Sequence, residues 1–204
     1  MIDSLLVFCG SRTGHDPAHA ELAAALGTLL AERGVTLVYG GGGVGLMGIM
    51  ARAALAGGGR VVGIIPQTLM TAEIAQGGLT EMIVVETLHE RKALMHARAD
   101  AILAIPGSIG TLDELFESMP WRELGIHDKP IWLLGPGGYW DSLLALLAHL
   151  DAAGFAPPDL DRLTMFLPDL AALDRVILDP LPLRTLDGAG ARGPTAIGTT
   201  GTRI

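Results

Sequence analysis

The chain has 204 residues, half of them hydrophobic, with 28 glycines and few aromatic side chains. This length can bury one hydrophobic core, and the composition is typical of an α/β protein with many strand-to-helix turns. A net charge of −8 and only two lysines, Lys92 and Lys129, leave no basic face, which excludes binding to a nucleic-acid polymer.

The first residues predict a buried strand. Ser4 to Cys9 is a short apolar run that ends in glycine, without the basic n-region of a signal peptide or the length of a membrane span. We therefore expect a cytoplasmic protein that does not bind membranes. Cys9 is the single cysteine, which excludes an internal disulfide, and its place at the end of an apolar strand indicates a buried thiol rather than a nucleophile.

Strands and helices alternate along the middle of the chain. After the loop 10–14, Asp16 caps and Pro17 opens a helix that runs to Arg33. Residues 67–80 have no clear periodicity. The other elements predicted in this half are a strand at 35–39, the glycine loop 40–48 with a helix to about 56, strands at 61–65 and 82–86, and a helix at 88–98.

The second half repeats the alternation, and its last residues differ in composition. The predicted elements are a strand over 100–105, a helix from near Thr111, a strand at 130–134, a helix at 142–152, a strand at 164–167 and a helix at 169–175. We expect one α/β domain over 1–180, a Rossmann-like doubly wound and mostly parallel sheet with ligands at the carboxyl ends of its strands. Residues 184–204 lack apolar periodicity and are expected to be disordered.

The stretch from Ala104 to Glu117 predicts a phosphate-binding loop between a strand and a helix. Gly107 and Gly110 can adopt backbone angles closed to other residues and have no side chain to block a ligand, so the N–H groups of 107 to 111 can converge on an anion. A helix that begins near Thr111 adds unpaired N–H groups and the positive end of its dipole.

Acidic residues lie close after this loop in the sequence. Asp113 and Glu114 are expected in the first turn of the helix, with Glu117 one turn on. Acids in that position complement the helix dipole in many proteins. The sharper interpretation is that one of them acts on atoms next to a bound phosphate.

Arg91 and Lys92 form the second candidate group. Neighbouring basic residues can be a solvated helix face, and Glu90 beside them fits that interpretation. Because lysine is so scarce here, we favour a role in binding phosphate or ribose oxygens. The histidines at 89, 96 and 127 do not have the spacing of a metal site, and no metal is expected.

A dinucleotide-binding protein is the rival interpretation. The runs 40–45 and 43–48 both match the pattern GxGxxG. However, that motif belongs after the first strand of its unit and needs an acid at the end of the next strand, which here ends in Pro66 and Gln67. We therefore expect neither NAD nor FAD.

These motifs together resemble the LOG proteins, which are cytokinin riboside 5′-monophosphate phosphoribohydrolases often mislabelled as lysine decarboxylases. The family pattern PGGxGTxEE is similar to residues 106–114, its RK pair to Arg91-Lys92, and WxQLGxHxKP to residues 121–130. The CGS, GGGxxGLMG, GIIP and GYWD segments also fit, so the resemblance covers residues 5 to 170. Ser108 replaces the second glycine of the loop, and Asp113 replaces the first glutamate.

The resemblance implies hydrolysis of the N-glycosidic bond of a nucleoside 5′-monophosphate such as AMP or its N6-modified relatives, without a cofactor, by a homodimer with Arg98 or Trp121 near the partner subunit. It assigns catalysis to Glu114 and Arg91. The residues that it implies for binding the phosphate or the rest of the substrate are Gly107, Ser108, Gly110, Thr111, Lys92, Asp113, Ser11, Arg12 and Gly45.

Two alternatives stay open beside this resemblance. A module that binds a purine monophosphate without turnover would fit a chain whose catalytic acids have drifted, as Asp113 suggests. A lysine decarboxylase would need a lysine that forms a Schiff base with pyridoxal phosphate, and neither Lys92 nor Lys129 is well placed for it.

Overall fold

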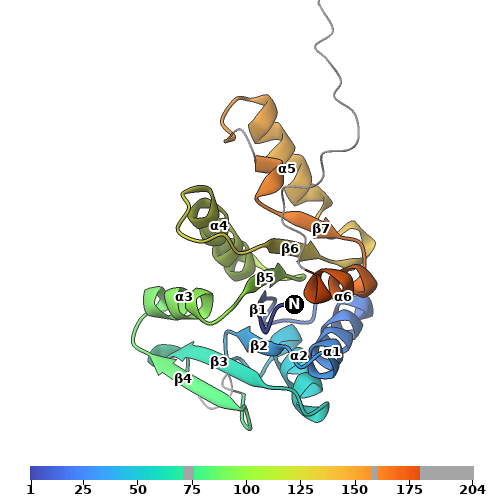
Figure 1. Cartoon of the computed structure of the whole chain (residues 1–204), viewed down its shortest axis with the longest axis vertical. Helices are drawn as coiled ribbons and strands as arrows, with labels where there is room; N and C mark the ends of the chain where they lie inside the picture. Colours follow the sequence, from blue (N-terminus) through green and yellow to red (C-terminus); the bar gives the residue numbers. More distant parts are fainter. Residues whose placement is uncertain (71–75, 158–159, 180–204) are drawn as a thin grey trace, which may run out of the picture.

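A seven-stranded sheet runs through the middle of the protein (Figure 1). The computed structural model describes residues 1–70, 76–157 and 160–179. Neighbouring strands are all parallel, in the order β4-β3-β2-β1-β5-β6-β7. The strands are β1 (Ser4–Phe8), β2 (Thr36–Tyr39), β3 (Val61–Pro66), β4 (Glu81–Val85), β5 (Ala101–Ala104), β6 (Ile131–Leu134) and β7 (Met165–Leu167).

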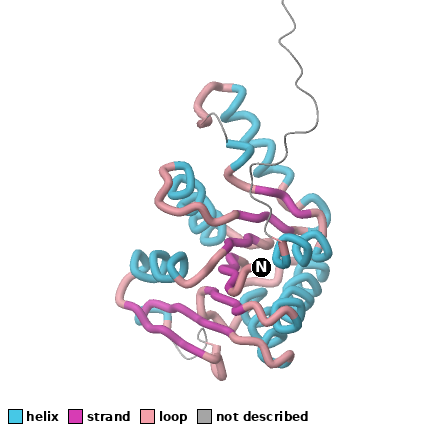
Figure 2. Tube along the Cα trace, viewed as in Figure 1, coloured by secondary structure: helices cyan, strands magenta, loops and turns pink. Residues whose placement is uncertain are grey.

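Helices cover both faces of the sheet (Figures 1 and 2). The α-helices are α1 (Pro17–Glu32), α2 (Gly45–Ala56), α3 (Leu88–Ala97), α4 (Ile109–Glu123), α5 (Asp141–Ala152) and α6 (Leu170–Leu178). Single 3₁₀ turns lie at η1 (Gln67–Leu69), η2 (Pro136–Gly138) and η3 (Leu160–Arg162). The predicted doubly wound α/β fold is confirmed.

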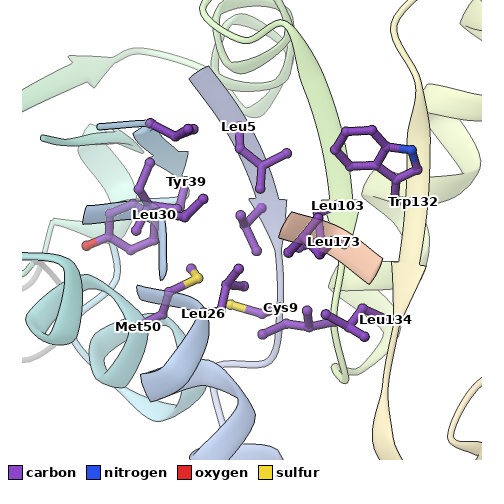
Figure 3. Close-up of a cluster of buried hydrophobic side chains, with 14 of the residues drawn as sticks. Leu5, Cys9, Leu26, Leu30, Tyr39, Met50, Leu103, Trp132, Leu134 and Leu173 are labelled. Atoms are coloured by element: carbon purple, nitrogen blue, oxygen red, sulfur yellow. The ribbon is translucent and has the colours of Figure 1, made fainter. Parts of the chain in front are cut away.

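Side chains of β1 alternate between two cores, one on each face of the sheet. Leu5 packs with α1, α2 and α6, through residues that include Leu26, Met50 and Leu173 (Figure 3). Leu6, the next residue, belongs to the core under α3, α4 and α5. Because both faces are buried, the strands are continuous apolar runs instead of alternating ones. Each fully buried leucine contributes about 1.5–3 kcal/mol of transfer free energy.

Two helices begin earlier than the sequence predicts. Helix α4 begins at Ile109 instead of near Thr111, because Ser108 has extended backbone angles (φ −111°, ψ −157°) and serves as the N-cap. Helix α2 begins at Gly45, inside the predicted glycine loop. The expectation that Asp113 and Glu114 lie in the first turn of the helix is therefore wrong: the first turn of α4 contains no acid, and both carboxylates lie in the second.

The winding direction changes between β1 and β5. From β1 the chain builds β2 to β4 on one side, and β5 to β7 on the other. The loops after these two strands meet, since the Gly10 N–H donates to the Pro106 carbonyl over 3.0 Å. Ligands of open α/β sheets bind at such a switch point, so this is the first place to look for a site.

At the amino ends of the strands, opposite the switch point, Asp100 forms a brace between β1 and β5. One carboxylate oxygen, Oδ2, accepts hydrogen bonds from the Asp3 N–H, the Ser4 N–H and the Ser4 hydroxyl, each over 2.9 Å. These residues begin β1 and β5, so the brace ties the amino ends of the two central strands together.

None of the helices in the described part of the chain combines the length and the hydropathy needed to cross a bilayer. Residues 184–204, which are predicted to be disordered, lie outside the described ranges. Positions 71–75 of the irregular stretch also lie outside them.

Candidate functional site

Two adjoining cavities lie at the switch point. The larger, of about 410 Å³, is walled by the loops after β1 and β5 together with His19 and Tyr139. The smaller, of about 150 Å³, extends toward Arg91 and Glu114. Both are lined by Gly10, Ser11, Ser108 and Gly110, so the two cavities form one continuous site.

The predicted phosphate-binding loop, residues 107–111 and called the anion loop below, forms part of the wall of both cavities. The N–H groups of Ile109, Gly110 and Thr111 have no intrahelical acceptor because they begin the helix, and in the described part of the chain no side chain caps them. Gly110 lines both cavities, and a Cβ there would meet nothing within 4 Å. The helix dipole and these donors favour an anion beside the loop.

The prediction that the glycines of this loop adopt backbone angles closed to other residues is wrong, and of the two only Gly107 is required by close packing. Neither Gly107 nor Gly110 has a positive φ. Gly107 is instead packed closely: a Cβ on it would overlap Thr111 Oγ1 and lie 2.9 Å from the Gly10 nitrogen. Ser108 is accommodated because its backbone is extended, a conformation that any residue adopts.

Tyr139 is a site residue that the sequence did not single out. Its hydroxyl accepts the Gly107 N–H over 3.2 Å and donates to the Gly107 carbonyl. The prediction that the Gly107 N–H is free for an anion is therefore wrong for this structure. The only signal in the sequence is the GYWD segment, which does not indicate that its tyrosine reaches a loop 32 residues away.

Glu114 and Arg91 face each other beside the smaller cavity. Glu114 Oε1 and Arg91 Nη2 are 3.4 Å apart, and each side chain is 14% exposed. Burial raises the pKa of Glu114 to about 7, against the opposing effect of Arg91. A carboxyl that titrates near neutrality, beside a cation and a cavity, suits general acid–base chemistry.

Gly40 and Cys9 complete the surroundings of this pair. A Cβ on Gly40 would overlap the Arg91 guanidinium, so this glycine at the end of β2 leaves the space that Arg91 occupies. Cys9 also lines the smaller cavity. Burial and the charge of Glu114 raise the pKa of its thiol, which supports the predicted role as a buried thiol.

Lys92 and Asp113 lie apart from the cavities. Lys92 Nζ is 2.8 Å from Asp113 Oδ2 and 3.1 Å from Glu117 Oε2, so it joins α3 to α4. Neither Lys92 nor Asp113 is among the described residues that line the two cavities. The neighbours Arg91 and Lys92 thus contact different acids of α4.

The remaining predicted binding residues lie on the loop after β1 and at the start of α2. Ser11 lines both cavities, and Arg12 lines the larger one. Gly45 does not line either; it packs behind the loop, where a Cβ would overlap the Ser11 and Arg12 backbone. The Leu46 N–H donates to the Gly10 carbonyl over 3.1 Å, which anchors α2 to the same loop.

His96 and His127 form a cluster with residues of α4, whereas His89 is exposed. His96 Nε2 lies 3.1 Å from the Ser118 hydroxyl, and the centroid of its ring lies 4.7 Å from that of Trp121 and 5.3 Å from that of His127, with the rings tilted to each other. Burial lowers the pKa of His96 to about 4 and also lowers that of His127. Within the described ranges, no group of three or more His, Cys, Asp and Glu side chains is arranged to hold a metal ion.

The chain is similar to one protein family and to several curated enzymes. Residues 47–175 match the family model described as possible lysine decarboxylase. The chain is 46% identical, over 80% of its length and 74% of the relative's, to the probable cytokinin riboside 5′-monophosphate phosphoribohydrolase LOGL1 of Oryza sativa subsp. japonica. It is 42% identical to the cytokinin riboside 5′-monophosphate phosphoribohydrolase LOG1 of Arabidopsis thaliana, over 87% of this chain and 84% of that protein.

Solved structures share the fold at lower identity. A molybdenum cofactor binding protein from Rippkaea orientalis superposes with a TM-score of 0.65 at 20% identity, over 87% of this chain and 96% of that one. The molybdenum cofactor carrier protein of Chlamydomonas reinhardtii gives a TM-score of 0.64 at 20% identity, over 87% of this chain and 97% of that one.

Proposed function

The chain belongs to the LOG family of cytokinin riboside 5′-monophosphate phosphoribohydrolases, and we propose on that basis that it hydrolyses the N-glycosidic bond of a cytokinin nucleoside 5′-monophosphate. The products are the free base, an adenine or N6-modified adenine, and ribose 5-phosphate. The observation that carries the proposal is the Glu114 carboxyl, whose pKa is raised by burial to about 7 beside Arg91 and next to an uncapped helix N-terminus.

The proposed reaction uses Glu114 as a general base. Water attacks C1′ of the ribose and gives a proton to the Glu114 carboxylate, while the C1′–N bond breaks and its electron pair leaves with the base. The base takes up one proton from solvent and Glu114 returns one to solvent, so that the carboxylate is restored. Positive charge develops on the ribose as the bond breaks, and a carboxylate stabilises it. Arg91 contacts the substrate near the ribose or the departing base.

Helix α4 sets the spacing between the two ends of the substrate. Gly110 at the anion site and Glu114 are four residues apart, so they lie on one face of the helix, separated by about 6 Å along the axis. That separation suits a ribose whose 5′-phosphate lies on the loop and whose C1′ lies beside Glu114. We therefore assign the phosphate to the larger cavity, which is lined by Gly107, Ser108, Gly110, Ser11 and Arg12, with Thr111 next to it in the smaller cavity.

Lys92 and Asp113 are proposed to position Arg91 without contacting the substrate themselves. The ion pairs from Lys92 to Asp113 and Glu117 hold α3 against α4, and this keeps Arg91 turned toward Glu114. The shorter side chain of Asp113, in place of the family's glutamate, still reaches Lys92 at 2.8 Å.

A homodimer is also proposed, and an apolar stripe on α4 supports it. Ile109 and Phe116 of α4 and its C-cap residue Leu124 recur on one face at spacings of seven and eight residues, with exposures of 76%, 38% and 73%. Exposed apolar residues that line up in this way are typical of an interface. Arg98, which is paired with Glu81, and Trp121 are the other candidates for contact with the partner.

The alternatives have less support. Lysine decarboxylase chemistry would need a free lysine for pyridoxal phosphate, whereas Lys92 pairs with two acids and Lys129 Nζ donates to the Ala99 carbonyl over 2.5 Å. A module that binds a nucleotide without turnover does not explain why a carboxyl titrating near pH 7 faces the cavity. We propose no cofactor.

The experiment is release of free base from AMP and from isopentenyladenosine monophosphate by the purified protein. Glu114→Gln is expected to lower the rate about 10²–10⁴-fold, the usual contribution of a general acid or base. Glu21→Gln, on the exposed side of α1, is the matched control. No release from either nucleotide, together with tight AMP binding, would support the binding module instead.

A further inference from the structure

Tyr139 reaches into the site from a segment that the proposed chemistry does not use. It follows η2 and lines the larger cavity. Gly137 and Gly138 before it have φ of 63° and 72°, a left-handed region that glycine adopts without strain, so the chain turns sharply just before the tyrosine. Its ring lies edge-on to His19, with the centroids 5.5 Å apart.

The Tyr139 hydroxyl satisfies both backbone groups of Gly107. It accepts the N–H and donates to the carbonyl. Among the described residues no other side chain hydrogen-bonds to positions 106–108, and the side chain of the N-cap residue Ser108 makes no capping hydrogen bond to α4. Gly107 has no side chain that could fix its own position. The position of this loop therefore depends on the Tyr139 hydroxyl, on the backbone hydrogen bond from the Gly10 N–H to the Pro106 carbonyl, and on close packing around Gly107.

We propose that Tyr139 is a positioning residue for the 5′-phosphate. Its hydroxyl fixes Gly107, and this keeps the start of α4 in place, with Gly110 on the wall of the larger cavity and Thr111 on the wall of the smaller one. The phosphate then binds to the helix N–H groups rather than to Gly107. The inference rests on the proposed function, because it names the residue that makes this site prefer a phosphorylated nucleoside.

The test compares Tyr139→Phe with Tyr39→Phe. The chain has only these two tyrosines, and Tyr39 is fully buried with a hydroxyl that has no hydrogen-bond partner among the described residues. Both variants lose the same atom, and only one of them loses contact with the loop. Removing an unpaired buried hydroxyl is close to neutral, so Tyr39→Phe should retain wild-type kinetics and melting temperature.

Tyr139→Phe is expected to raise KM for AMP about tenfold, equivalent to about 1.4 kcal/mol, with kcat within about twofold of the wild type. Residual hydrolysis of adenosine, which has no phosphate, should be unchanged. Equal losses with AMP and adenosine, or an unchanged KM for AMP, would overturn the proposal.

A binding measurement keeps this test separate from that of the hydrolase. Ribose 5-phosphate is titrated by calorimetry into the wild type and both variants. About tenfold weaker binding to Tyr139→Phe alone supports the inference even if no base is released from any nucleotide, a result that would overturn only the proposed activity. Equal affinity in all three proteins would overturn the inference, whether or not base is released.

Discussion

Arg91 Nη2 lies 3.4 Å from Glu114 Oε1, close enough for strong attraction but longer than a short charge-assisted hydrogen bond. Both side chains are largely shielded from water, so burial outweighs this attraction and the pKa of Glu114 stays near 7. The pair therefore has a carboxyl that can take up a proton at neutral pH and a cation whose removal would make proton loss harder.

The first prediction concerns the pH dependence of the reaction. If Glu114 must be ionised to accept a proton from water, kcat/KM for AMP should rise with pH through about 7 and then level off. In Arg91→Gln the midpoint should move to higher pH, because the cation that lowers the pKa of Glu114 is gone. Arg91→Lys, which keeps the charge, should retain the wild-type midpoint. A rate that falls with pH through 7 would instead make Glu114 a general acid.

The second prediction concerns stability. The pKa of Glu114 is higher in the folded state, about 7, than its ordinary value of 4.5. The folded state thus binds more protons between these pH values, and the free energy of unfolding should decrease as pH rises through that window. Glu114→Gln removes the cost of burying the charge and should be more stable by about 1–3 kcal/mol at pH 8, with little gain at pH 4. Urea titrations at the two pH values measure it; an equal change at both would contradict the explanation.

Gly107 and Gly110 should respond differently to the same substitution. Gly107→Ala places a Cβ against Thr111 and Gly10, so we expect a loss of about 1–3 kcal/mol of stability. Gly110→Ala has room for the Cβ and gains helix propensity, so its melting temperature should be unchanged or higher. Its methyl group would project beside the anion site, and KM for AMP should rise severalfold. Thermal melts and steady-state kinetics of the pair, which serve as controls for each other, test this prediction.

The oligomeric state should depend on the apolar stripe of α4. Phe116→Arg is expected to convert a dimer into a monomer, because a charge would have to be buried at the interface. Phe155→Arg, at an 85% exposed phenylalanine after α5, should leave the mass unchanged. Light scattering after size-exclusion chromatography measures both. A wild-type monomer, or a dimer that tolerates both substitutions, would rule out this interface.

The order of strands and helices was predictable because each buried strand is an unbroken apolar run closed by glycine or proline. The proximity of Arg91 and Glu114 could also have been predicted. Both residues follow parallel strands, and the carboxyl ends of parallel strands lie on the same side of the sheet. The start of α4 was not, because it depends on the backbone angles of Ser108 and not on its type.

The contacts that the sequence did not predict join distant positions. Nothing in the local pattern around Tyr139 indicates a hydrogen bond to Gly107, and nothing near Lys92 indicates that it pairs with α4 rather than with a substrate. Such contacts follow from how helices and loops pack once the sheet has formed. Local periodicity contains no information about that packing.

The Asp100 brace lies at the amino ends of β1 and β5, whereas the residues proposed to contact the substrate lie beyond the carboxyl ends of the strands. Mutations at the amino ends of these strands should therefore affect stability, and mutations at the carboxyl ends should affect activity. Selection for abundance in a saturation library would report on Asp100 and Ser4, and selection for turnover would report on the loops at the other end. New ligand preferences can then evolve in these loops while the brace keeps the scaffold folded.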